Sequence, residues 1–98
     1  MKLIIRDDAF YILGSVLDGD ASMLKEIQNS QRETVIVDLS GCAMLCSLSI
    51  GVLVHAHGKL EKEGKKLILR NPLPNTKELL VNLKLDTIME IIETESIK

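Results

Sequence analysis

Hydrophobic positions follow two different periods along the chain, and these periods predict its strands and helices. Residues 34–39 form a β-branched apolar run with the length of a buried strand, and residues 66–70 form a second one that Asn71-Pro72 stops. Between them, residues 47–64 carry apolar positions at helical spacing, and Gly64 is placed to cap that helix. Such a strand–helix–strand unit packs with parallel, right-handed connectivity.

The segment before this unit predicts a hairpin and a helix. Residues 3–5 and 10–13 are two short apolar strands that would pair across the turn-like Asp7-Asp8. A turn at residues 18–20 then leads into a short helix, for which Asp20 or Ser22 is the expected N-cap. The residues expected to point inward from this helix are Met23, Leu24 and Ile27.

The segment after residue 70 predicts one more helix and one more strand. The helix would begin at Pro74, with Asn75 and Glu78 spaced as a capping box. Its apolar face would consist of Leu79, Leu80 and Leu83. Residues 88–92 would form the last strand, followed by a polar tail to Lys98 that would fray. We therefore expect one α/β domain over residues 1–98, with a mixed central sheet of about five strands and helices packed against it.

Composition and charge narrow the function classes. The chain is 46% hydrophobic with one Phe, one Tyr and no Trp, so the core must be aliphatic. A net charge of −2 argues against a nucleic-acid partner. No apolar run approaches the roughly 18 residues of a membrane span, and the N-terminal apolar stretch is too short for a signal peptide. We therefore expect a cytoplasmic protein, in which Cys42 and Cys46 would not form a disulfide.

The helix at residues 47–64 carries the most specific candidate site. Its period places Ser49, Val52, Leu53, Ala56 and Leu60 on the core face. Ser47 lies on the opposite side, in line with Gly51, Val54 and Gly58. A glycine inside a helix costs about 1 kcal/mol relative to alanine, and close approach of another protein surface would offset that cost. Ser47 is then either a phosphorylation site that a partner kinase reaches or simply the helix N-cap.

Other chemistry has weaker signals. Cys46, at a helix N-terminus, is either a redox-reactive thiol or a small buried apolar residue. His55 and His57 point in divergent directions on a helix, so no metal site is expected. Asp38, at a strand end, is interpreted as a solvated or turn-bonding aspartate. Phosphate-binding and nucleophile-elbow motifs are absent from the sequence, which favours a protein that is not an enzyme and holds no cofactor.

Four segments of the chain resemble the STAS family of anti-sigma factor antagonists. They are residues 35–41, Ser47, residues 50–54 and residues 64–69, and the likeness continues through Leu85-Asp86 to Ile91. The resemblance implies a small switch protein that binds a serine-kinase anti-sigma factor. The kinase would phosphorylate Ser47, using its own ATP and Mg²⁺, and a serine phosphatase would reverse the modification.

The resemblance also implies a partner-binding surface around Ser47. Residues 14–18 resemble the family's turn beside the acceptor serine, from which Asp18 is carried over. The full set of expected partner-binding residues is Asp18, Cys46, Ser47, Ile50, Gly51, Val54 and Gly58.

The turn at Ser47 also departs from the family pattern. Cys46, Leu48 and Ser49 stand where the family has an acid, a second hydroxyl and a glycine. These departures favour an alternative function as an unphosphorylated STAS adaptor in a signalling assembly or a transporter complex. A redox-responsive binding protein that uses Cys46 is a further alternative. A homodimer and a small-ligand pocket are both compatible with the sequence.

Overall fold

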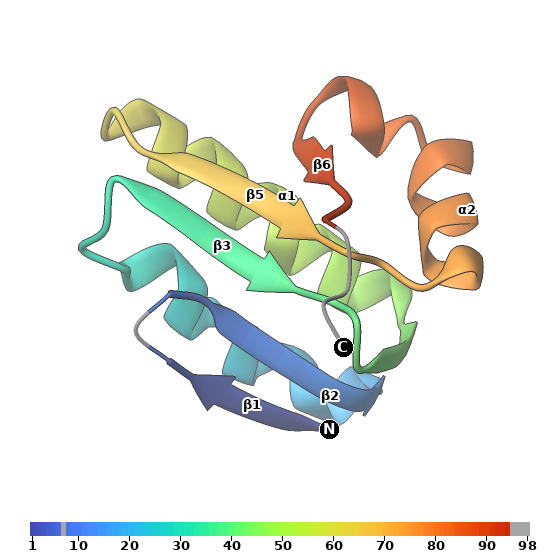
Figure 1. The fold of residues 1–98 in the computed structure, drawn as a ribbon. Helices are drawn as coiled ribbons and strands as arrows, with labels where there is room; N and C mark the ends of the chain where they lie inside the picture. Colours follow the sequence, from blue (N-terminus) through green and yellow to red (C-terminus); the bar gives the residue numbers. More distant parts are fainter. Residues whose placement is uncertain (7, 95–98) are drawn as a thin grey trace.

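The computed structural model describes residues 1–6 and 8–94. A six-stranded sheet forms one layer and the helices pack on it (Figure 1). The elements, in chain order, are β1 (Lys2–Ile5), β2 (Phe10–Val16), the 3₁₀ helix η1 (Asp18–Asn29), β3 (Thr34–Asp38), β4 (Cys42–Leu45), α1 (Ser47–Lys62), β5 (Lys66–Arg70), α2 (Pro74–Asn82), the 3₁₀ helix η2 (Leu85–Thr87) and β6 (Glu90–Ile92).

The sheet is mixed, as the sequence predicts. Its main order is β1-β2-β3-β5-β6, in which only β1 is antiparallel to its neighbour. The predicted hairpin of β1 and β2 and the predicted parallel pair of β3 and β5 are both confirmed. Residue Asp7 of the expected hairpin turn and the tail from residue 95 lie outside the described residues.

Strand β4 was not predicted. It pairs in parallel with the second half of β2, whereas β3 pairs with the first half, and the β2–β4 register shifts between Gly14 and Ser15. Gly41 forms the turn before β4, and its carbonyl accepts a hydrogen bond from the Gly14 N–H at 2.8 Å. A Cβ atom at Gly41 would lie 2.5 Å from the end of the Leu13 side chain, so a larger residue here would have to displace that side chain.

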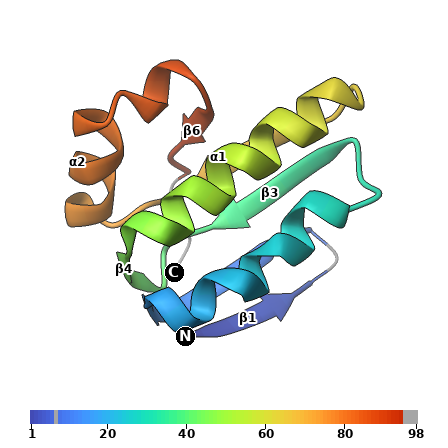
Figure 2. The ribbon, with the colours of Figure 1, turned by 180° about the vertical axis from the view of Figure 1, so that it is seen from behind.

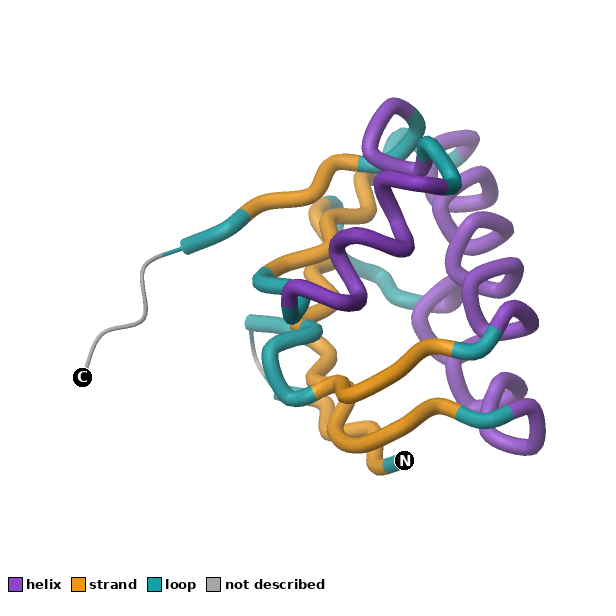
Figure 3. The backbone as a smooth tube through the Cα atoms, turned by 90° about the vertical axis from the view of Figure 1, so that its right-hand side faces the viewer, coloured by secondary structure: helices purple, strands orange, loops and turns teal. Residues whose placement is uncertain are grey.

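Helices η1 and α1 lie side by side on one face of the sheet, with α1 nearer the middle strands (Figure 2). Seen edge-on, the strands lie on one side and the helices on the other (Figure 3). The core between the two layers is aliphatic, as expected, and its largest fully buried side chains include Ile12, Leu24, Ile27, Leu39, Leu53, Leu60, Leu67, Leu69 and Leu80. The second face of the sheet carries no helix among the described residues.

Several predicted details of the helices are wrong. The N-cap of η1 is Leu17, while Asp20 lies inside the helix and its carboxylate accepts a hydrogen bond from the Leu17 N–H at 3.0 Å. Asn75 does not cap α2, because Leu73 is the N-cap and the Asn75 side chain donates to the Ala43 carbonyl instead. Three apolar side chains that the pattern directs inward or assigns to the last strand are instead about half exposed: Met23, Leu83 and Ile88.

Candidate partner-binding surface around Ser47

Ser47 lies where two parallel strands end and a helix begins. Strand β4 ends at Leu45, and the N–H of Cys46 donates to the Val16 carbonyl at 3.1 Å, which holds this turn against the end of β2. Ser47 is the first residue of α1 and is exposed. Its hydroxyl forms no hydrogen bond with any described residue. Within the part of the chain that the structure describes, no hydrogen bond therefore holds this hydroxyl in the fold.

The N-cap of α1 is Cys46, so the interpretation of Ser47 as the N-cap is wrong. The Cys46 Sγ accepts a hydrogen bond from the Ser49 N–H at 3.4 Å, and the Ser49 hydroxyl donates to the Cys46 carbonyl at 2.6 Å. Ser49 is fully buried, as the helical period predicts. The two serines thus differ: Ser49 stabilises the first turn of α1 through its hydrogen bonds to Cys46, whereas Ser47 faces solvent.

Asp18 lies beside Ser47 in the fold, at the start of the neighbouring helix. The register pairs Val16 with Leu45, so two residues further on η1 begins at Asp18 and α1 begins at Ser47. The expected turn at residues 14–18 is not a loop, since Gly14 to Val16 belong to β2. The structure nevertheless brings an exposed carboxylate to the same end of the helix layer as the serine.

Three exposed apolar side chains, which we call the apolar collar, lie around this turn. Leu17, Met44 and Leu48 are 55%, 46% and 55% exposed. They come from three elements that meet here: Leu17 caps η1, Met44 lies in β4, and Leu48 follows Ser47 in α1. The sequence does not reveal the collar, because apolar residues at the ends of predicted elements do not differ in pattern from core residues.

The exposed face of α1 continues the surface away from Ser47. A hollow of about 430 Å³ lies between η1 and α1. It is lined by Lys25, Gln28, Ser47, Leu48, Gly51, Val52 and His55. A Cβ atom at Gly51 or Gly58 would meet no atom within 4 Å outside its own helix turn, so packing within the chain does not require either glycine.

Two expected members of the surface are less exposed than predicted. Ile50 is only 8% exposed and belongs to the core, so its expected place on the binding surface is wrong. Val54 is half-buried and packs against the same core, so it offers part of its side chain. Ile50 follows the buried Ser49 along α1, and it is buried on the same side of the helix as Leu53.

Asp38 belongs to a separate polar cluster at the ends of β3 and β5. It is 5% exposed and forms an ion pair with the Arg70 Nε at 2.7 Å, while its other oxygen accepts hydrogen bonds from the Ser40 N–H and hydroxyl. Arg70 also donates to the Tyr11 hydroxyl at 3.0 Å. The turn-bonding interpretation of Asp38 is confirmed, whereas the solvated one is wrong.

Hydrogen bonds stabilise the ionised form of the Asp38 carboxyl in this cluster. Burial alone raises the pKa of the Asp38 carboxyl, but the hydrogen bonds from Ser40 and the Arg70 guanidinium outweigh it and hold this pKa below its usual range. The ionised Asp38 carboxylate is therefore paired with Arg70 within the chain.

The cysteines and the possible metal ligands are the remaining candidate groups. Both cysteines are free, and burial raises the pKa of the Cys42 thiol, which disfavours its reactive thiolate. Within residues 1–6 and 8–94, no group of three or more His, Cys, Asp or Glu side chains could hold a metal ion. The helices in the same ranges include none long and apolar enough to cross a membrane.

Comparison with known families identifies the fold. Residues 15–96 match the family model of the STAS domain. The chain belongs to the STAS domain family. No protein with a curated function matches the sequence. The fold agrees with the residues that carried the resemblance in the sequence, namely the β3–α1–β5 unit and the turn at Ser47.

Two solved structures show how similar the fold is. The crystal structure of a candidate anti-sigma factor antagonist from Thermotoga maritima superimposes with a TM-score of 0.77 at 21% identity, covering 96% of this chain and 86% of the other. The anti-sigma factor antagonist SpoIIAA in its unphosphorylated form gives a TM-score of 0.71 at 13% identity, covering 98% and 88% of the two chains. At these identities the likeness establishes the STAS fold.

Proposed function

We propose that this STAS domain is an anti-sigma factor antagonist that binds a serine-kinase anti-sigma factor and is switched off by phosphorylation of Ser47. The observation that carries the proposal is the placement of Ser47, exposed and without an internal hydrogen bond, beside the apolar collar. The domain acts by binding and performs no catalysis itself. A serine phosphatase would restore the unmodified state.

The surroundings of Ser47 suit a switch that changes binding without unfolding the domain. A phosphate adds about −1.5 to −2 charges at pH 7. At the start of α1 the helix dipole and the unpaired N–H groups favour this charge. For a docked partner, however, the phosphate would lie beside Leu17 and Leu48, where a charge must lose water in order to be covered. Asp18, at the start of the neighbouring helix, adds like charge.

The apolar collar supplies the binding energy in this proposal. Large side chains that are desolvated on docking contribute most of the affinity of typical interfaces. The glycines at positions 51 and 58 let a partner backbone approach α1 closely, which gives a reason for two residues that the fold itself does not require. The binding surface therefore comprises Asp18, Cys46, Ser47, Gly51, Val54 and Gly58, extended by Leu17, Met44 and Leu48.

Exchanging Ser47 in the native host tests the proposal. Tagged wild-type chain, Ser47→Ala and Ser47→Asp variants would be purified and the bound kinase quantified. We expect the kinase to be retained by the wild type and by Ser47→Ala and to be lost from Ser47→Asp. Asn82→Asp, which adds the same charge on exposed α2, is the matched control and should still bind.

One alternative function has support from the collar. An unphosphorylated adaptor would keep its apolar contacts permanently, and Leu48 stands where the family has a hydroxyl. Equal retention of the same partner by wild type and Ser47→Asp would favour the adaptor and contradict the switch.

A further inference from the structure

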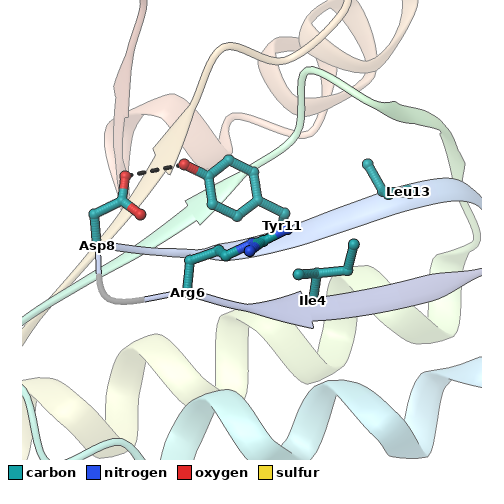
Figure 4. Close-up of a pocket in the computed structure, with 5 residues that line it drawn as sticks. All are labelled: Ile4, Arg6, Asp8, Tyr11 and Leu13. Carbon is teal, nitrogen blue, oxygen red and sulfur yellow. Dashed lines mark hydrogen bonds between the residues drawn. The ribbon is translucent and has the colours of Figure 1, made fainter.

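The sheet face that carries no helix among the described residues has a hollow of its own, which shares no lining residue with the hollow beside Ser47. Its volume is about 470 Å³, within the range of small-molecule sites. The hollow lies over β1 and β2 and is lined by Ile4, Arg6, Asp8, Tyr11 and Leu13. Figure 4 shows Asp8 and Arg6 at one end, Ile4 and Leu13 at the other, and the Tyr11 ring between them.

The strand register explains why these side chains meet. Antiparallel pairing sets Ile4 directly opposite Tyr11, so both project from the same face of the sheet. Leu13, two residues after Tyr11, projects from that face as well. The result is an apolar wall on a face that no helix of the described chain covers.

The charges at the rim are not equivalent. Asp8 already accepts a hydrogen bond from the Tyr11 hydroxyl at 2.9 Å and lies 3.6 Å from the Arg70 guanidinium. The Tyr11 hydrogen bond holds the pKa of the Asp8 carboxyl below its usual range. Arg6, in contrast, forms no ion pair with any residue in the described part of the chain. Among the described residues, the Arg6 guanidinium is therefore the charged group of this hollow that has no counter-charge.

We propose that this hollow binds a small amphiphilic carboxylate, with its anionic head on the Arg6 guanidinium and its apolar body along Ile4, Leu13 and the Tyr11 ring. A guanidinium pairs with a carboxylate through two parallel hydrogen bonds. A single unpaired cation suits a monoanion better than a doubly charged phosphate. This site is independent of the Ser47 surface, which lies on the helix side of the sheet.

Tyr11 makes the proposal directly measurable. It is the one tyrosine of a chain without tryptophan, so the intrinsic tyrosine fluorescence reports on this hollow. Octanoate is the probe, titrated below its aggregation concentration. We expect a saturable change in fluorescence, together with amide NMR shifts confined to β1 and β2. Acetate, which lacks the apolar body, should bind at least about tenfold more weakly.

The charge of the head group and Arg6 provide the decisive controls. Arg6→Ala should weaken octanoate binding roughly tenfold or more, as expected for a lost charged hydrogen bond. Arg6 is exposed, so this variant should fold. Lys62→Ala, which removes one positive charge from exposed α1, should leave binding unchanged.

Four results would overturn the site. They are no saturable signal with octanoate, equal binding of 1-octanol, tighter binding of octylammonium, and unchanged binding after Arg6→Ala.

Discussion

Two polar residues at neighbouring strand ends have opposite surroundings, although both stood out in the sequence. Asp38, at the end of β3, is buried and its two oxygens are held by Arg70 and Ser40. Ser47 lies just beyond β4 and is exposed. Its hydroxyl forms no hydrogen bond with any described residue. The contacts of a polar residue, more than its place at a strand end, therefore distinguish a structural group from one that is free to meet a partner.

The apolar residues around Asp38 and around Ser47 also differ in their exposure to solvent. Around Asp38 the aliphatic side chains are buried in the sheet, among them Val37 and Leu69. Around Ser47, Leu17, Met44 and Leu48 remain exposed. We therefore expect changes at the Asp38 cluster to affect stability and changes at the Ser47 surface to affect binding.

The largest expected effect on stability comes from breaking the Asp38 cluster. Arg70→Met should lower the free energy of unfolding by about 3 kcal/mol or more, because it leaves the Asp38 carboxylate buried without its counter-charge. Urea denaturation followed by circular dichroism measures this change. Adding Asp38→Asn to the same chain should recover much of the loss. A loss below about 1 kcal/mol for Arg70→Met would contradict the structural role of the cluster.

Leu48→Glu tests the expectation that the surface around Ser47 affects partner binding and not stability. We expect the affinity for the kinase partner to fall roughly 100-fold, as for loss of a central interface residue. The free energy of unfolding should change by no more than about 0.5 kcal/mol, because Leu48 is exposed. Isothermal titration calorimetry gives the affinity. Ile88→Glu replaces a side chain of similar exposure near η2 and should bind normally; equal losses for both variants would contradict a localised surface.

Gly58→Arg extends this test along α1. A side chain at position 58 meets no neighbouring atom within 4 Å at its Cβ, so the fold should remain nearly intact. Partner binding should be lost, because the arginine would prevent close approach to the helix. Binding to the same immobilised partner by surface plasmon resonance would check this, and normal binding would remove position 58 from the surface.

Gly51→Ala separates stability from binding at a single position. The substitution should raise the free energy of unfolding by about 1 kcal/mol, because alanine favours the helix and the added methyl group has room. It should also weaken partner binding modestly. Thermal unfolding and calorimetry on the same sample measure the two effects. A stabilised variant with unchanged affinity would show that the partner does not contact α1 at position 51.

The smallest expected effect is a pH dependence of stability that belongs to Asp38. Its pKa in the folded chain lies below that in the unfolded chain, which is about 3.9. The unfolded chain therefore binds more protons, so the stabilisation is complete above about pH 5 and is lost as the pH falls through the folded pKa. Asp38→Asn should flatten the stability profile below pH 5, whereas Ser47→Ala should leave it unchanged.

The strands and the main helix could be predicted because their apolar runs are bounded by clear stop signals. Asn71-Pro72 ends β5 at Arg70, and Gly64, with a φ of +77°, ends the helix turn after Lys62. Strand β4 was missed because four residues carry too short a pattern to distinguish a strand from a turn.

The exposed surface around Ser47 could be predicted only in part. The helical period correctly separated Ser47 and Gly51 from the buried Ser49 and Leu53. Ile50 was expected on the partner-binding surface but is buried, because a position at the border of a helix face is decided by the packing of the neighbouring core. The collar depends on how three elements meet, which no local pattern contains.

Site mapping of the protein purified from its own host is the most direct test of the central claim, that Ser47 is a regulatory group and not a structural one. Intact mass followed by peptide fragmentation, across growth and stress conditions, would locate any phosphate. We expect a gain of one phosphate on Ser47, in a fraction of molecules that changes with conditions. A chain that stays unmodified at Ser47 under all of them would contradict the switch.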